Sequence, residues 1–64
     1  MKLKEVKKGD YFTLKRIDYP KDSQVYVKGD YDFSERCYVC HAFNDINKFR
    51  CFKGDKIVFQ DFTF

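Results

Sequence analysis

Three copies of the tripeptide Lys-Gly-Asp divide this 64-residue chain into short segments, and they constrain its fold more than any other feature. They lie at Lys8–Asp10, Lys28–Asp30 and Lys53–Asp55, and they contain all three glycines. Glycine permits a positive φ, and aspartate caps a turn through its own backbone. Each triplet therefore predicts a reversal of the chain, with short antiparallel strands between the reversals.

Apolar and polar residues alternate in the segments between these turns. The alternation covers Tyr11–Ile17, Gln24–Tyr31 and Arg36–Phe43, and shorter strands are expected at Phe49–Phe52 and Lys56–Phe64. A period of two indicates strands with one buried face. No longer window shows the helical period of about 3.6 residues.

Length and composition narrow the architecture further. A chain of 64 residues forms a single domain, residues 1–64, with no room for a second core. The 8 Phe and 5 Tyr side chains compensate for the short length, since each buried ring removes roughly 150–250 Å² from water. We expect a mainly β domain with at most one short helical turn, near Asn44–Lys48. Its five antiparallel strands would form a small barrel, SH3-like or OB-like, or a curled meander, and closure would hide the sheet edges.

The alternation also assigns the side chains to two faces. The expected core face contains Phe12, Leu14, Val25, Val27, Cys37, Val39 and Phe43. The opposite face collects tyrosines and basic residues, which proteins use to stack bases and contact phosphates of single-stranded nucleic acid. We therefore predict a nucleic-acid or partner-binding face at Lys15, Tyr26, Lys28, Arg36 and Tyr38. The alternative is that the tyrosines only stabilise the sheet through cross-strand pairs.

Charge gives a weaker indication in the same direction. The net charge is +3, from 13 basic and 10 acidic residues. Residues 1–16 carry +4, residues 17–45 carry −3 and residues 46–64 carry +2. Basic ends that meet in the fold would attract an anionic partner, although solvated charge also serves solubility alone.

The segment Cys37-Tyr38-Val39-Cys40-His41 matches the C-x-x-C-H string of c-type haem attachment. With Cys51, the same segment has the ligand types of a zinc site. Residues three apart in a strand point to opposite faces, so Cys37 and Cys40 would not bind one metal. We expect core cysteines that behave as small apolar side chains, a neutral, hydrogen-bonded His41 on the core face, and no metal or cofactor.

No residue pattern indicates catalysis. His41 adjoins Cys40, but neighbours in a strand face opposite ways and form no dyad. The chain contains no P-loop and no nucleophile elbow. Asp30–Glu35 begins like a calcium loop, yet Glu35 stands where that loop requires glycine, so an acidic hairpin tip is expected. We therefore predict that the protein is not an enzyme.

The sequence also bears on the cellular compartment. The basic N-terminus is not followed by the apolar region of a signal peptide. No aliphatic or aromatic run exceeds three residues, as at Ile57–Phe59, whereas a membrane span needs about 20. An odd number of cysteines then predicts free thiols in a reducing cytoplasm, without membrane contact.

Five segments together resemble one group of proteins. They are Lys8–Leu14, Val25–Asp32, Tyr38–Cys40, Asn44–Asn47 and Asp61–Phe64. The chain resembles small uncharacterised proteins encoded in gut Bacteroidota genomes and their phages or mobile elements. The resemblance covers most of the chain and implies no particular activity or site residue.

The sequence therefore predicts a cytoplasmic, non-enzymatic binding module, with nucleic acid as the first candidate partner. The alternative is a protein-interaction or host-modulating accessory factor of phage or mobile-element origin. Such a factor would use the same aromatic face and could form a homodimer. Salt dependence separates the two, because nucleic-acid binding weakens steeply with ionic strength.

Overall fold

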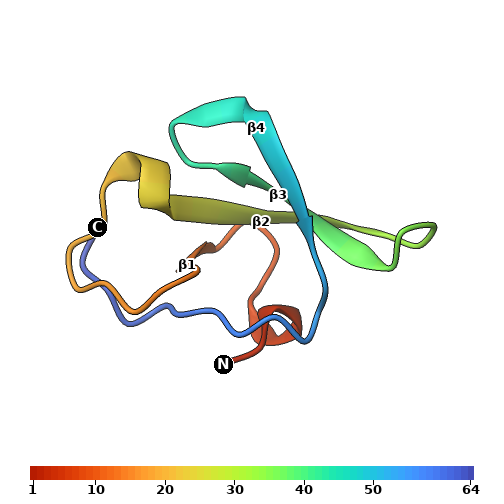
Figure 1. Ribbon diagram of the computed structural model, residues 1–64, viewed down its shortest axis with the longest axis horizontal. Helices are drawn as coiled ribbons and strands as arrows, with labels where there is room; N and C mark the ends of the chain where they lie inside the picture. Colours follow the sequence, from red (N-terminus) through yellow and green to blue (C-terminus); the bar gives the residue numbers. More distant parts are fainter.

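The computed structural model describes residues 1–64 and contains one open antiparallel sheet of four strands (Figure 1). The elements are η1 (Leu3–Glu5), β1 (Tyr11–Thr13), η2 (Asp22–Gln24), β2 (Val25–Asp32), β3 (Cys37–Ala42) and β4 (Asp45–Phe52). The spatial order β1-β2-β3-β4 is also the order in the chain. The predicted mainly β class and antiparallel meander are confirmed, but the sheet is not closed into a barrel. The expectation of at most one short helical turn is wrong, because the structure has two turns of 3-10 helix, and neither lies at Asn44–Lys48.

The predicted fifth strand, Lys56–Phe64, does not join the sheet as a strand. This segment makes two isolated bridges, Lys2 with Ile57 and Thr13 with Phe59. Because the two bridges connect it to different parts of the chain, no continuous ladder forms along any one strand. The segment instead runs beneath the sheet beside η1 and the end of β1 (Figure 1). This is why the barrel stays open.

Two of the three Lys-Gly-Asp triplets are turns, as predicted. Gly9 has a φ of 89°, which glycine adopts without strain, and Gly54-Asp55 turns the chain after β4. The prediction is wrong for the second triplet, because Gly29 lies inside β2, where the pairing with β3 shifts register between Lys28 and Tyr31. A Cβ on Gly29 would overlap the carbonyl oxygen of Val39. Glycine is needed there for a β-bulge rather than for a reversal.

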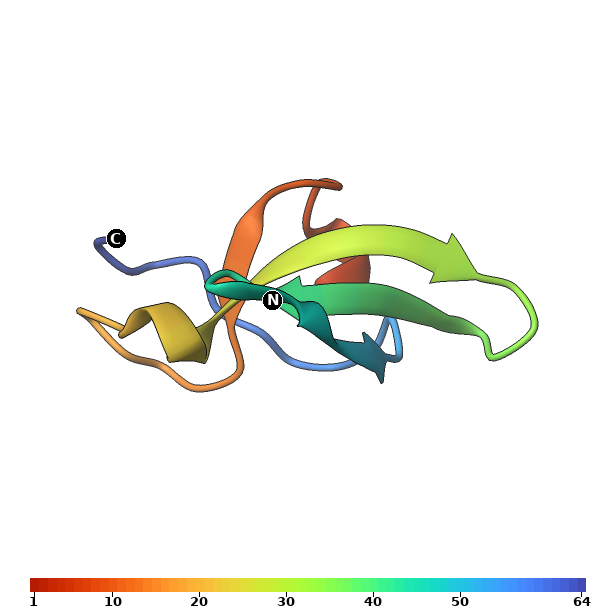
Figure 2. The same ribbon diagram turned by 90° about the horizontal axis from the view of Figure 1, so that it is seen from above.

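One face of the sheet, here called the inner face, packs against the terminal segments. The buried cluster consists of Leu3, Val6, Phe12, Cys40 and Val58, and none of these side chains is more than 3% exposed. The residues that pack against it are partly buried: Leu14, Tyr26, Tyr38 and Phe52. The core therefore lies between the inner face and two segments that are more than 50 residues apart in sequence. Figure 2 shows β2 and β3 side by side, curving together into the hairpin that ends the molecule.

In the central strands, the predicted core face and the predicted exposed face are interchanged in the structure. Phe12, Val25 and Cys37 are buried as expected, but Val39 is 36% and Phe43 is 40% exposed. Tyr26 and Tyr38, expected on the surface, instead pack against the core. Alternation fixed which residues share a face and left open which face is covered, because both faces carry apolar side chains. The opposite side, here called the outer face, contains Val27, Val39, His41 and Phe49.

Candidate functional site

The five predicted site residues do not form one surface. Lys28 is the clearest departure, since it is only 6% exposed and lies on the inner face opposite Cys40. Its ammonium group donates a hydrogen bond to the backbone oxygen of Val6 and lies 4.0 Å from the ring centroid of Tyr38. The expectation of an exposed Lys28 is therefore wrong. The long apolar stem of lysine explains the burial, because it packs like a hydrophobic side chain while the amine finds a partner.

The burial of Lys28 affects two titratable groups. Loss of hydration lowers the pKa of the Lys28 ammonium, and the nearby Cys40 opposes this effect. Burial also raises the pKa of the Cys40 thiol, against the smaller influences of the Gly29 backbone and Lys28. Both groups therefore favour their neutral forms more than they would in water.

Arg36 and Tyr38 do lie together, at the end of the β2–β3 hairpin. They line a hollow of about 360 Å³, here called the Tyr38 hollow. The hollow is lined by Lys4, Tyr31, Arg36, Tyr38, Lys53, Gly54 and Asp55. Three of these side chains are cationic and one is anionic, and two are tyrosines. This is a basic hollow with aromatic walls.

The bulge at Gly29 builds one of these walls. Without it, Lys28 and Tyr31 would point to opposite faces, because they are three residues apart in a strand. The register shift brings both toward Tyr38, so that Tyr31 and Tyr38 become direct cross-strand partners. Their ring centroids are 4.9 Å apart in an edge-to-face arrangement, and Tyr31 remains 38% exposed. Tyr38 is thus held by Lys28 and by Tyr31.

Arg36 enters the hollow from an unusual backbone conformation. It is the only non-glycine residue with a positive φ, at 56°, and it closes the four-residue turn before β3. Glycine or asparagine is the ordinary choice for such a position. The turn is otherwise stabilised by Asp32, whose carboxylate accepts hydrogen bonds from the amides of Ser34 and Glu35. An arginine there costs backbone energy, which points to a use for its side chain.

The other two predicted residues, Lys15 and Tyr26, lie near η2. They line a smaller hollow of about 220 Å³ together with Leu14, Ile17, Ser23 and Gln24. Tyr26 also borders a hollow of about 390 Å³ between η2 and the β3–β4 hairpin. That hollow adds the cations Lys48 and Arg50. The predicted set is therefore split between two ends of the molecule, with Lys28 buried between them.

Sequence reasoning missed several basic residues that the fold brings to these hollows: Lys4, Lys48, Arg50 and Lys53. Lys48, Arg50, Lys53 and Arg36 form no ion pair, whereas Lys4 lies 3.9 Å from Asp55. The signal for Lys4 and Lys53 was the excess of positive charge in both terminal segments. It did not show which side chains would meet.

The cysteines are arranged differently from the expectation of three free thiols. Cys37 and Cys51 form a disulfide between β3 and β4, with Cα atoms 5.6 Å apart, and only Cys40 is free. Cys37 and Cys40 do face opposite sides of β3, as alternation predicted. His41, expected in the core, lies half-buried on the outer face. The premise of free thiols is therefore wrong for two of the three cysteines, and their odd number no longer argues for a reducing compartment.

Neither short helical turn is long and apolar enough to cross a membrane. No protein-family model, curated protein or solved structure matches the chain.

Proposed function

We propose that the protein is a non-enzymatic module that binds single-stranded nucleic acid in the Tyr38 hollow. The observation that carries the proposal is the meeting of Lys4, Arg36 and Lys53 around the rings of Tyr31 and Tyr38. Single-strand binders combine cations that follow the phosphates with rings on which bases stack, each stacked base contributing about 1–3 kcal/mol. The hollow offers both kinds of contact within one small site.

The roles follow from exposure. Tyr31 is the ring that a base reaches, because it is 38% exposed, while Tyr38 forms the floor and is half-buried. Arg36 and Lys53 carry no carboxylate partner and are free to meet phosphates. Lys4 pairs with Asp55 only at 3.9 Å on an exposed surface, a contact that contributes little. Lys28 supports the floor from the buried side and does not touch the ligand.

The hollow near Tyr26 supplies a second point of contact for a longer strand. Lys15 borders one side of Tyr26, and Lys48 and Arg50 border the other. No acidic residue lines either of these two hollows. Four of the five predicted residues therefore keep a binding role: Lys15, Tyr26, Arg36 and Tyr38. The fifth, Lys28, has a structural role.

A protein-interaction role is the second candidate. It is favoured by a different surface, the outer face, where Val39, Phe43 and Phe49 are exposed. This surface lies on the side of the sheet opposite the Tyr38 hollow, although Phe49 also borders the hollow near Tyr26.

Fluorescence anisotropy with labelled single-stranded oligonucleotides tests the nucleic-acid proposal. Three cations on phosphates predict a slope of about −2 in log affinity against log salt. Replacing Arg36 or Lys53 by alanine reduces the slope by about 0.7, and Tyr31→Ala weakens binding by about 10-fold or more at constant slope. Lys21→Ala is the matched control, because Lys21 is exposed and lines none of these hollows. Absence of binding at low salt, or equal loss in the Lys21 control, contradicts the proposal.

A further inference from the structure

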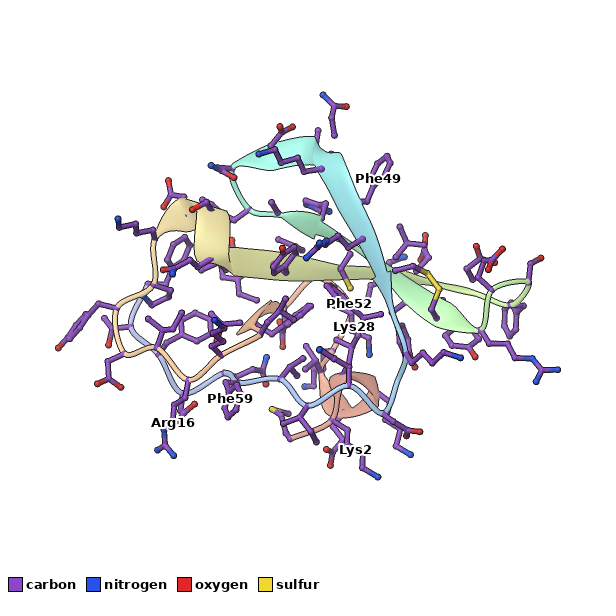
Figure 3. All side chains as sticks on the ribbon, in the orientation of Figure 1. Lys2, Arg16, Lys28, Phe49, Phe52 and Phe59 are labelled. Atoms are coloured by element: carbon purple, nitrogen blue, oxygen red, sulfur yellow. A yellow bond between two sulfur atoms is a disulfide. The ribbon has the colours of Figure 1, made fainter.

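The outer face of the sheet is exposed at several apolar residues, whereas Thr13, Val25 and Cys37 on the same side are buried. The strand register places Tyr11, Val27, His41 and Phe49 in one row across all four strands. Val39 and Cys51 form the neighbouring pair on the same face. The exposed fractions are 42% for Tyr11, 36% for Val39 and 65% for Phe49. Figure 3 shows the Phe49 ring beside β4, apart from Lys28 and Phe52 in the middle of the molecule.

Three aromatic rings extend this surface at one end. Tyr11, Phe43 and Phe64 contact one another edge to face, with centroids 4.7–5.7 Å apart. Phe43 is 40% and Phe64 is 49% exposed, so the cluster is ordered by its own contacts and remains open to solvent. The C-terminal Phe64 is itself part of this cluster, while Val39 and Phe49 remain exposed beyond it.

Charge is almost absent from the same surface. The row from Tyr11 to Phe49 and the pair beside it contain no Lys, Arg, Asp or Glu. At the hairpin end, Asp30 pairs with Lys8 and Asp32 accepts the turn amides. An uncharged apolar face is complementary to an identical face, because a two-fold axis brings no like charges together.

The size of the surface agrees with a second copy as its partner. Its four exposed rings, each about half open, offer about 400 Å² per copy if a full ring covers roughly 200 Å². With Val27, Val39, His41 and Cys51, two copies would bury about 1,200 Å² in all, the lower end of specific interfaces. We propose that the protein forms a symmetric dimer by packing the outer faces of two copies. The two sheets then form a sandwich with a spacing of about 10 Å.

Sedimentation equilibrium from about 1 μM to about 1 mM tests the dimer, because small apolar interfaces associate in this range. We expect the mass of two chains at the upper end for the wild type. Val39→Lys and Phe49→Lys place cations against each other across the two-fold axis and weaken association by about 100-fold or more. Tyr19→Lys is the matched control, because Tyr19 is 79% exposed and lies in the loop before η2. It should dimerise as the wild type does.

Two features keep the test decisive. Val39 lies on β3, an internal strand, so edge-to-edge pairing through β4 would survive Val39→Lys and contradict the proposal. Far-UV circular dichroism must show that the monomeric variants keep their sheet, which is expected because both side chains are already exposed. If either variant unfolds, intermolecular NOEs between Val39 and Phe49 in a mixed-isotope sample of wild type replace it. A wild type that is monomeric at about 1 mM, or dimers lacking these NOEs, overturns the proposal.

Discussion

Lys28→Met tests whether the buried amine of Lys28 stabilises the fold. Methionine keeps the length of the apolar stem and removes only the ammonium group. The lost contacts are the hydrogen bond to Val6 and the interaction with the Tyr38 ring, whose centroid is 4.0 Å away. Because Val6 is only 3% exposed, its carbonyl oxygen would lose its partner without gaining free access to water.

The magnitude is a balance of opposing effects. A hydrogen bond from a charged donor contributes about 1.5–3 kcal/mol, and a desolvated cation–π contact contributes up to about 2 kcal/mol. Removing the charge relieves a desolvation cost of several kcal/mol, which offsets most of that loss. The unpaired carbonyl adds a cost of about 1 kcal/mol. We therefore expect Lys28→Met to destabilise the protein by about 1–2 kcal/mol, and Lys28→Ala by about 2 kcal/mol more through lost burial of the stem.

Thermal unfolding at neutral pH measures this difference. For a domain of this size, about 1–2 kcal/mol corresponds to a decrease in Tm of about 5–15 °C. Oligonucleotide binding provides the second measurement, since Lys28→Met should bind with the salt slope of the wild type. A variant as stable as the wild type would show that the amine contributes nothing. A stable variant that loses nucleic-acid binding would show that the amine meets the ligand.

The pH dependence has a definite sign. Burial lowers the pKa of Lys28 in the folded state below its ordinary value of 10.5. In the window between the two values, the unfolded chain holds more protons at this residue than the folded chain. Stability from Lys28 therefore rises with pH through this window, up to 10.5. The stability gap between the wild type and Lys28→Met should widen as alkaline pH is approached, and a gap that narrows contradicts the assignment.

Three further substitutions or treatments test separate features. Gly29→Ala should cost about 2 kcal/mol or more in chemical unfolding, because its Cβ meets the Val39 carbonyl oxygen; an unchanged midpoint would exclude the tight bulge. Reducing the Cys37–Cys51 disulfide opens a loop with a sequence separation of 14 and should lower the free energy of unfolding by about 3 kcal/mol. An unchanged Tm after reduction would show that the bond does not constrain the fold. Arg36→Gly should raise stability by up to about 1 kcal/mol while weakening oligonucleotide binding, and a loss of stability would argue against strain at its φ of 56°.

The strands were predictable from alternation and the hairpins from turn chemistry. The hairpin at Asp32–Glu35 lies where Asp32 caps the turn, as its sequence indicates. The residues at which the strands begin and end were harder to predict. β1 ends at Thr13 rather than at Ile17, and β4 begins at Asp45 rather than at Phe49. In β4 the difference is a second register shift, which a strict period of two does not describe.

The site could be predicted only in part, because it depends on a bulge and on a buried lysine. The sequence predicts a turn at Gly29, since nothing local distinguishes a glycine needed for a close approach from one needed for a reversal. Alternation assigns Lys28, Tyr26 and Tyr38 to one face and predicts that this face is exposed, whereas Lys28 is buried and both tyrosines pack against the core. The register shift after Lys28 then changed which residues meet Tyr38. Only long-range packing with Val6 determines that the amine has a buried partner.

The exposure of residues that have the pattern of a core face has a physical explanation. The pattern of Val27, Val39 and Phe43 is that of a core face, yet Val39 and Phe43 are exposed and Val27 is only half-buried. Leu3, Val6 and Val58 of the terminal segments cover the inner face, whereas Phe64 contacts Tyr11 and Phe43 at one end of the outer face. If a second copy covers the outer side, both faces are buried and the apolar pattern is explained without a barrel. The Tyr38 hollow then remains open on each copy, and the dimer would hold one nucleic-acid strand at two points, with higher affinity than either hollow alone.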